Sequence, residues 1–101
     1  MKLIFRPAFW LDADRHHLWL CQNVSEVLAD RWLEAVLDTI CFLRDNPEIG
    51  RLRRDLKHPG IRSWLVSGFN RWTIFYGVRN EALVFYRIEG GARNLRGLLI
   101  G

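Results

Sequence analysis

The stretch RWTIFYGVRNEALVFYRI (residues 71–88) contains two runs of aromatic and β-branched residues separated by a short polar break. Such residues favour strands, and the break at 79–81 is short enough for a hairpin. Trp72 and Ile74 would point to one face of the first strand, yet Phe75 on the opposite face is apolar as well. The stretch therefore predicts two antiparallel strands that are apolar on both faces.

The second run repeats this two-sided pattern, with Val84, Tyr86 and Ile88 expected on one face and Leu83 and Phe85 on the other. A strand buried on both faces needs cover on both, and a single layer of helices covers only one. We expect the second face either to be covered by the chain's own C-terminus or to remain an apolar patch for a partner.

Two further segments extend the predicted sheet. GIRSWLVSG at 60–68 is a third strand, joined to the first run by a short turn. KLIFR at 2–6 is a compact apolar segment stopped by Pro7, and it can add to the same sheet. We expect an antiparallel meander of the later strands with this N-terminal strand added to it.

Between these strands, residues 8–45 change to a helical period of three to four. A first helix would align one stripe of side chains: Trp10, Leu11, Asp14, His17, Leu18 and Cys21. A second helix would be capped by Asn23 or Ser25 and carry an apolar stripe from Val24 to Leu43. Its opposite side holds an acidic row that we expect to be solvated: Glu26, Asp30, Glu34 and Asp38.

The size of the chain limits its organisation. Its 101 residues, of which 50% are hydrophobic, suit one core. We therefore expect a single α+β domain over residues 1–101, with an N-terminal strand and a helical hairpin packed on an antiparallel sheet. No apolar run approaches the roughly 18 residues of a membrane span, and no signal-peptide cleavage site is evident. A cytoplasmic protein is expected, with Cys21 and Cys41 reduced, buried and roughly 25 Å apart along the helices.

Charge is distributed unevenly along the chain. Residues 1–50 hold five Lys/Arg against eight Asp/Glu, whereas residues 51–101 hold ten against three. The connector that follows the helices, GRLRRDLKHPGIRSW at residues 50–64, is too rich in charge, proline and glycine for a core. Its candidate contact residues are Arg51, Arg54, Lys57 and Arg62. The connector is either a solvated surface or a basic face for nucleic acid or an acidic protein, and at least one of its arginines is expected to pair with Asp55 or a hairpin carboxylate.

No motif indicates a cofactor or a metal ion, and none is expected. The glycine-rich phosphate-binding pattern is absent. His16 and His17 are adjacent, so a helix directs them to different faces, and the two cysteines lack the spacing of zinc ligands.

Several segments together resemble the ParE toxins of the RelE/ParE superfamily. The most specific are PGIRS (59–63), F-x-R-W-x-I-F-Y (69–76) and GARNL (91–95). The resemblance extends over nearly the whole chain and implies a RelE/ParE-like fold. It also implies the toxin of a bacterial type II toxin–antitoxin system, wrapped by a partly disordered cognate antitoxin, with a higher-order assembly of the two allowed. ParE-type members are understood to poison DNA gyrase, whereas RelE-type relatives cut mRNA on the ribosome.

The end of the last predicted strand helps to choose between gyrase inhibition and mRNA cleavage. Many superfamily members carry a histidine at the position of Gly90, which has no side chain. Tyr86, Arg87 and Lys57 are present, but no acid–base pair for RNA cleavage is evident, and Glu89 is expected to face solvent. We therefore expect a non-catalytic gyrase inhibitor. The alternatives are a RelE-like ribosome-dependent mRNA endoribonuclease and a degenerate toxin-fold module that only binds its antitoxin.

Two sets of contact residues are expected. The C-terminal segment would bind the target through Arg93, Arg96, Leu98 and Leu99, since arginine suits bidentate contacts to carboxylate or phosphate. The same leucines would otherwise pack back over the sheet. Aromatic side chains, where exposed, would anchor the antitoxin: Trp10, Trp19, Trp32, Trp72 and Phe75.

Overall fold

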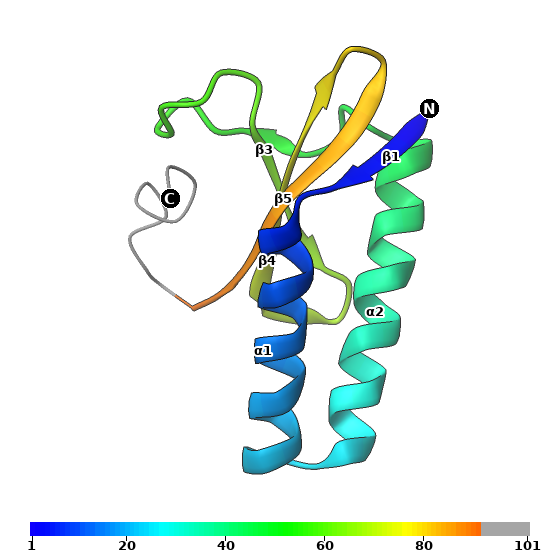
Figure 1. The fold of residues 1–101 in the computed structure, drawn as a ribbon, viewed down its shortest axis with the longest axis vertical. Coiled ribbons are helices and arrows are strands. Elements are labelled where there is room, and N and C mark those ends of the chain that lie inside the picture. The colour runs from blue at the N-terminus through cyan, green and yellow to red at the C-terminus, as the bar shows by residue number, and fades with distance from the viewer. Residues whose placement is uncertain (92–101) are drawn as a thin grey trace.

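The fold is taken from a computed structural model, which describes residues 1–91. The elements in this part of the chain are β1 (Lys2–Phe5), α1 (Pro7–Asn23), α2 (Glu26–Asp45), β2 (Arg51–Leu52), β3 (Arg62–Val66), β4 (Phe69–Arg79) and β5 (Ala82–Gly90). The strands form one sheet in the order β1-β5-β4-β3-β2, and the two helices pack on one of its faces (Figure 1). The predicted α+β architecture is confirmed, with β2 as an additional short strand.

The N-terminal strand joins the sheet in parallel. β1 pairs with β5 in a register that runs from Lys2 opposite Ala82 to Phe5 opposite Phe85. All other neighbouring strands are antiparallel. The helical hairpin separates β1 from the meander, so the orientation of β1 is not set by a tight turn. The sheet is therefore mixed, not antiparallel throughout as the sequence suggested.

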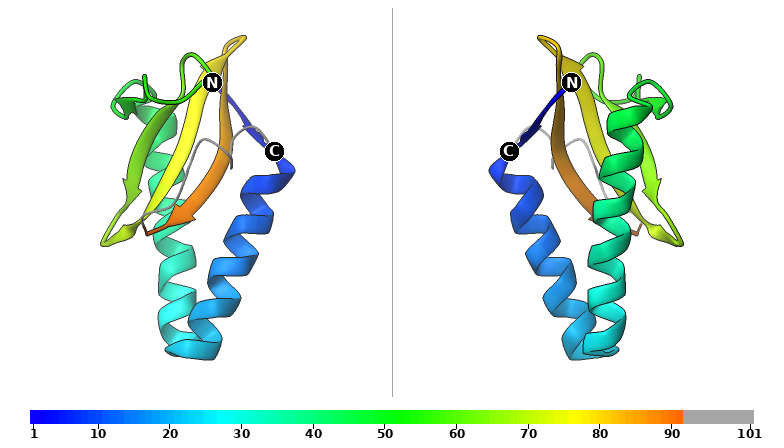
Figure 2. Two further views of the ribbon diagram at one scale, coloured as in Figure 1. Left: turned by 90° about the vertical axis from the view of Figure 1, so that its left-hand side faces the viewer. Right: turned by 90° about the vertical axis from the view of Figure 1, so that its right-hand side faces the viewer.

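The helical hairpin follows the predicted boundaries closely. Pro7 occupies the first turn of α1, where its missing N–H is not needed. Ser25 is the cap of α2, because its hydroxyl accepts the Leu28 N–H at 3.0 Å, whereas the Asn23 amide donates to the Trp19 carbonyl. The helices converge at their connecting turn and diverge toward the sheet (Figure 2). Within the described residues, no helix is both long and apolar enough to cross a membrane.

The main core lies between the hairpin and the sheet. Its largest fully buried side chains include Trp32, Phe9, Ile74, Tyr76 and Phe85. The acidic row of α2 is exposed, as predicted. The predicted helix is present, but its buried face is not the stripe named from the spacing: the buried residues are Phe9, Asp12, Ala13, His16 and Leu20. The aromatic residue at 9 thus enters the core, and its neighbour at 10 lies at the surface.

A β-bulge changes which side chains of β5 face the helices. Tyr76 of β4 pairs with Phe85, whereas its neighbour Phe75 pairs with Arg87, so β5 holds one extra residue here. The alternation of side chains along β5 consequently changes phase. Phe85 and Ile88 both lie in the main core, and the prediction that they occupy opposite faces is wrong.

The second face of the sheet is covered in part by the connector. Leu56 and Ile61 are buried against Phe75, and Tyr86 packs beside them. The expectation that the connector is too polar for a core is therefore wrong, since two of its apolar residues close over the sheet. The expected burial of the cysteines is also only partly right: both are free thiols, but Cys41 is exposed and Cys21 is half-buried.

Candidate functional site

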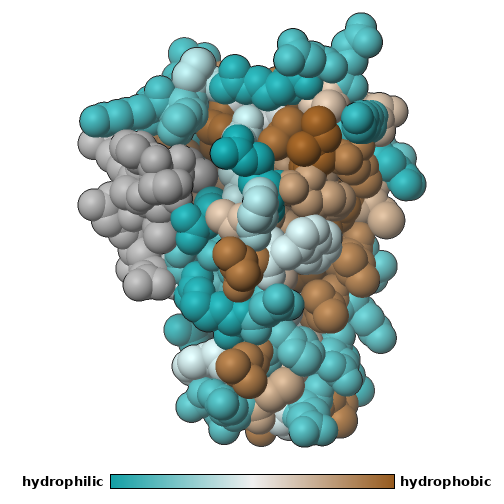
Figure 3. Space-filling model, in the orientation of Figure 1, coloured by the Kyte–Doolittle hydropathy of each residue, from teal (hydrophilic) through white to brown (hydrophobic). Residues whose placement is uncertain are grey.

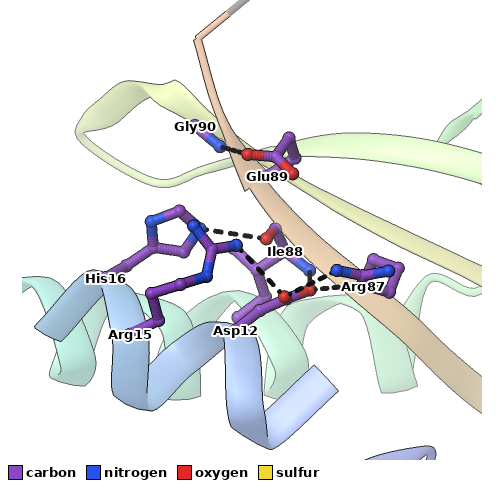
Figure 4. Close-up of polar contacts among 7 residues, drawn as sticks. All are labelled: Asp12, Arg15, His16, Arg87, Ile88, Glu89 and Gly90. Atoms are coloured by element: carbon purple, nitrogen blue, oxygen red, sulfur yellow. Dashed lines mark hydrogen bonds and ion pairs between the residues drawn. The ribbon is translucent and has the colours of Figure 1, made fainter. Parts of the chain in front are cut away.

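The open edge of β5 is completed by side chains of α1. β1 pairs with β5 only as far as Phe85, and α1 lies beside the next part of the strand. The Asp12 carboxylate accepts the Ile88 N–H at 3.0 Å, and the His16 Nε2–H donates to the Ile88 carbonyl at 3.1 Å (Figure 4). Two side chains of one helix thus take the place of a neighbouring strand and satisfy backbone groups that would otherwise be buried without partners.

Asp12 is also the acceptor of a bidentate ion pair with Arg87. Its two oxygens receive Nε at 2.6 Å and Nη2 at 2.9 Å, and Arg15 approaches the same carboxylate at 3.2 Å. The Asp12 side chain is almost fully buried. Hydrogen bonding to Asp12 raises the pKa of Arg87 further above its usual value. The pair joins α1 to the bulged part of β5 and holds the guanidinium in one orientation.

His16 is held as a neutral side chain. Burial lowers the pKa of its imidazole below the ordinary value, opposed by the hydrogen bond to Ile88. Since the carbonyl can only accept, the proton of the neutral ring lies on Nε2. No group of three or more potential metal-ligating side chains occurs among residues 1–91.

The end of β5 borders a small cavity of about 240 Å³. Its lining residues are Arg15, His16, Trp19, Arg71, Trp72, Glu89, Gly90 and Gly91. A Cβ atom at Gly90 would lie 2.8 Å from Nε1 of Trp72, so this indole occupies the space that a side chain would need. Glu89 is 2% exposed, which contradicts the expectation that it faces solvent. The packing of Trp72 against Gly90 therefore explains why this position has no side chain.

A larger apolar groove of about 440 Å³ lies between α2 and β3. It is lined by Asp38, Thr39, Phe42, Trp64, Leu65, Val66, Ser67 and Asn70. The rings of Phe42 and Trp64 stack at 5.8 Å and form one apolar wall. Phe42 and Leu65 are both exposed. The groove therefore offers apolar surface to a partner without any rearrangement of the core.

Arg62 binds the backbone of the turn that follows α2. Its Nη1 donates to the carbonyls of Glu48 at 3.1 Å and Gly50 at 2.9 Å. The Gly50 N–H in turn donates to the hydroxyl of Tyr76 at 2.8 Å. Arg62 is therefore structural, but its partners are backbone carbonyls and not the carboxylates that we expected. Asp55 pairs with Arg53 instead.

Replacing Arg62 by alanine is expected to lower the free energy of unfolding by about 1–3 kcal/mol, since two charge-assisted hydrogen bonds are lost. Urea unfolding of the purified protein measures the change. Arg54→Ala is the matched control, because this exposed arginine makes no hydrogen bond or ion pair in the described part of the chain. Equal stability of both variants would show that the contacts of Arg62 are dispensable.

The remaining connector cations are at the surface. Arg53 forms a bidentate pair with Asp55 at 2.6 and 2.9 Å, which lowers the pKa of this carboxyl to about 2. Arg51, Arg54 and Lys57 are exposed and have no ion pair within residues 1–91. The predicted contact residues are thus available to a partner, with the exception of Arg62.

The predicted antitoxin anchors fall into two groups. Trp10 and Trp19 are 37% and 50% exposed, and Trp72 is half-buried. Trp32 and Phe75 are 0% and 1% exposed, so they do not meet the condition of exposure and are withdrawn as anchors. The four predicted target-binding residues lie outside the described residues: Arg93, Arg96, Leu98 and Leu99.

Sequence reasoning missed the roles of Asp12 and His16. A usable signal was present, because the two polar residues stand four apart on the helix face that also carries Phe9, Ala13 and Leu20. Polar side chains on a buried stripe need hydrogen-bond partners. The partners themselves, Arg87 and Ile88, are more than 70 residues away in the chain.

Comparisons with known proteins agree with this fold. A family model described as "ParE toxin of type II toxin-antitoxin system, parDE" matches residues 3–95. A solved structure titled "Chromosomal ParDE TA system from P. aeruginosa" superposes with a TM-score of 0.75 at 16% identity, covering 91% of this chain and 97% of that chain. At this identity the likeness shows a shared fold. No curated protein sequence matches the chain.

Proposed function

Because the chain belongs to the ParE toxin family of type II toxin–antitoxin systems, we propose that it inhibits DNA gyrase in the bacterial cytoplasm and is neutralised by a cognate antitoxin. The match of the family model to residues 3–95 carries this proposal. Gyrase inhibition is the known role of the family. The toxin acts by binding, without catalysing a reaction of its own.

The arrangement around β5 supports binding over RNA cleavage. An arginine that stabilises a phosphorane must be able to reach it, yet the guanidinium of Arg87 is held by Asp12. His16 points its proton at the Ile88 carbonyl, and position 90 has no side chain to act as acid or base. Arg87, which sequence alone offered for nuclease chemistry, therefore has a structural role.

The antitoxin is proposed to dock in the α2–β3 groove. Phe42, Trp64 and Leu65 supply an apolar surface of the kind that an amphipathic segment covers. The exposed indoles of Trp10 and Trp19 provide further anchors on α1.

The gyrase-binding segment is proposed to be the C-terminus, through Arg93, Arg96, Leu98 and Leu99. The described chain ends at the exposed Gly91, whose φ of +80° turns the backbone as it leaves β5. Two arginines and three later apolar residues follow in the sequence. A segment of this composition can combine bidentate contacts with apolar burial on a partner.

Gyrase and ribosome assays together test the proposed function. Incubated with gyrase, ATP and supercoiled plasmid, the toxin is expected to trap plasmid cleaved by gyrase, and it is expected to leave mRNA on translating ribosomes intact. Cut mRNA with unaffected gyrase would identify a ribonuclease. No effect in either assay would identify a module that only binds its antitoxin.

The same gyrase assay tests the docking groove when the antitoxin is added. Leu65→Glu places a carboxylate in the apolar groove, so this variant should trap cleaved plasmid but escape neutralisation. Val78→Glu is the control, because Val78 is an exposed residue of β4 that lies outside the groove and is not one of the proposed anchors. If the antitoxin neutralises both variants equally, it does not use the groove.

A further inference from the structure

Positive charge is concentrated in the strands and their connector. Residues 51–91 hold eight Lys/Arg against three Asp/Glu, whereas residues 7–45 of the hairpin hold three against seven. Of the three acids in the basic part, Glu89 is buried and Asp55 is bound to Arg53. The exposed cations of this region are thus hardly neutralised by their own neighbours.

These cations are most dense in the segment at residues 51–60, which we call the basic loop. It projects from the sheet beyond β3, at the upper left of Figure 1, and its surface there is hydrophilic in Figure 3. Arg51, Arg54, Lys57 and His58 are exposed. Cationic side chains, and not apolar ones, therefore dominate what the basic loop offers to a partner.

The basic loop is held in place from beneath. Leu56 is buried against the sheet, and the Arg53 N–H donates to the Ile61 carbonyl at 2.8 Å. Arg79 Nη2 donates to the Pro59 carbonyl at 2.6 Å. A Cβ at Gly77 would lie 2.9 Å from the Gly60 carbonyl oxygen, so the loop rests directly on β4. Binding would therefore cost little additional ordering of the backbone.

From this geometry we propose that the basic loop binds the phosphate backbone of duplex DNA, without sequence preference. Arginine forks match phosphate oxygens, and unpaired surface cations displace counterions from the duplex. The loop carries no phenylalanine, tyrosine or tryptophan that would stack on a base, so the contacts position the protein on the backbone and do not read the sequence. The proposal does not depend on gyrase being the target.

An acidic peptide fits the basic loop less well than a duplex. Peptide recognition combines charge with pockets for apolar side chains. The hollow of about 420 Å³ within the loop itself has mainly cationic side chains beside Leu52, Leu56 and Pro59. The larger apolar groove lies away from the loop between α2 and β3, where Asp38 is part of the lining. A loop that projects from the surface suits a groove in its partner, as duplex DNA provides. The acidic hairpin would face away from the phosphates and orient the bound protein.

Fluorescence anisotropy with a short labelled duplex of mixed sequence tests the proposal on the full chain. Wild-type protein should bind, with an affinity that falls between about 50 and 200 mM salt. The variant Arg51→Ala/Arg54→Ala/Lys57→Ala should lose about tenfold in affinity or more, and its salt slope should become shallower by about three, one for each lost phosphate contact.

A control variant with the same change in net charge distinguishes DNA binding at the basic loop from general attraction of DNA to a positively charged protein. Lys2→Ala/Arg31→Ala/Arg44→Ala removes three exposed cations elsewhere and should leave the salt slope within about one unit of wild type. Circular dichroism melts confirm that both variants are folded. Equal losses in the two variants, or no binding by the folded wild type, would overturn the proposal.

Two competitors decide the class of partner. Unlabelled duplex should displace the labelled probe more effectively than single-stranded RNA of equal length or polyglutamate of equal charge. Tighter binding of the RNA would assign the loop to RNA. Tighter binding of polyglutamate would assign it to an acidic protein, and in either case the proposal of a duplex-binding loop would be wrong.

Discussion

Replacing Asp12 by alanine is expected to lower the free energy of unfolding by about 3–5 kcal/mol, because it removes one partner of a buried ion pair. The change takes the bidentate acceptor from Arg87 and the carboxylate acceptor from the Ile88 N–H. A loss of this size is a large part of the stability of a small domain, which is typically about 5–15 kcal/mol. Urea unfolding, followed by tryptophan fluorescence, measures the loss.

Asp14→Ala is the matched control for this prediction. Asp14 is exposed on the same helix, and its replacement should change the unfolding free energy by no more than about 0.5 kcal/mol. The double variant Asp12→Ala/Arg87→Ala should be less destabilised than the sum of the two single variants. Additive effects would mean that the two side chains are not coupled and that the carboxylate serves mainly the backbone of β5.

Deleting residues 94–101 is expected to abolish growth inhibition while the protein stays folded and still binds its antitoxin. The physical reason is that the described residues 1–91 already hold a hydrophobic core and a five-stranded sheet, whereas the proposed target-binding residues lie after them. Growth of cells that express the shortened toxin, together with its melting temperature and antitoxin affinity, measures the three properties.

The result separates a target-binding segment from a structural one. A shortened protein that unfolds, or that melts far below the full chain, would show that Leu98 and Leu99 cover the sheet. The double variant Arg93→Lys/Arg96→Lys is a milder test on the full chain, since lysine retains the charge but not the bidentate fork. Full toxicity of this variant would exclude arginine-specific contacts with the target.

Periodicity in the sequence was sufficient to predict most of the elements. The helical period over residues 8–45 and the runs at 60–68, 71–78 and 82–88 correspond to helices and strands in the structure. Local signals also placed the start of α2, where Ser25 supplies the cap. These features depend on neighbours in the chain, which is why residue spacing reveals them.

The errors arose where distant segments determine the environment of a residue. An alternating pattern cannot reveal the extra residue opposite Phe75 and Tyr76, and one inserted residue changes the face of everything beyond it. The burial of Phe75 depends on Leu56 and Ile61 folding back over the sheet. The burial of Glu89 likewise results from other segments that cover its strand, which composition does not show.

The candidate site was even less accessible to sequence reasoning. Asp12 and His16 are identifiable as polar residues on a buried helix face, but their partners on β5 are set by the packing of α1 along the open strand edge. The basic connector, by contrast, was predictable from its charge. What the structure added is that Arg62 serves the fold, while Arg51, Arg54 and Lys57 remain at the surface.

The parallel pairing of the first strand with the last described strand has a consequence for the order of events during synthesis. Among the described residues, β1 pairs only with residues 82–85, so the sheet cannot close while a ribosome is still making the middle of the chain. Contacts of such long sequence separation also form slowly. For nearly the whole of its translation the nascent chain therefore lacks the completed sheet, and a partner that recognises the folded surface can bind it only when synthesis is almost finished.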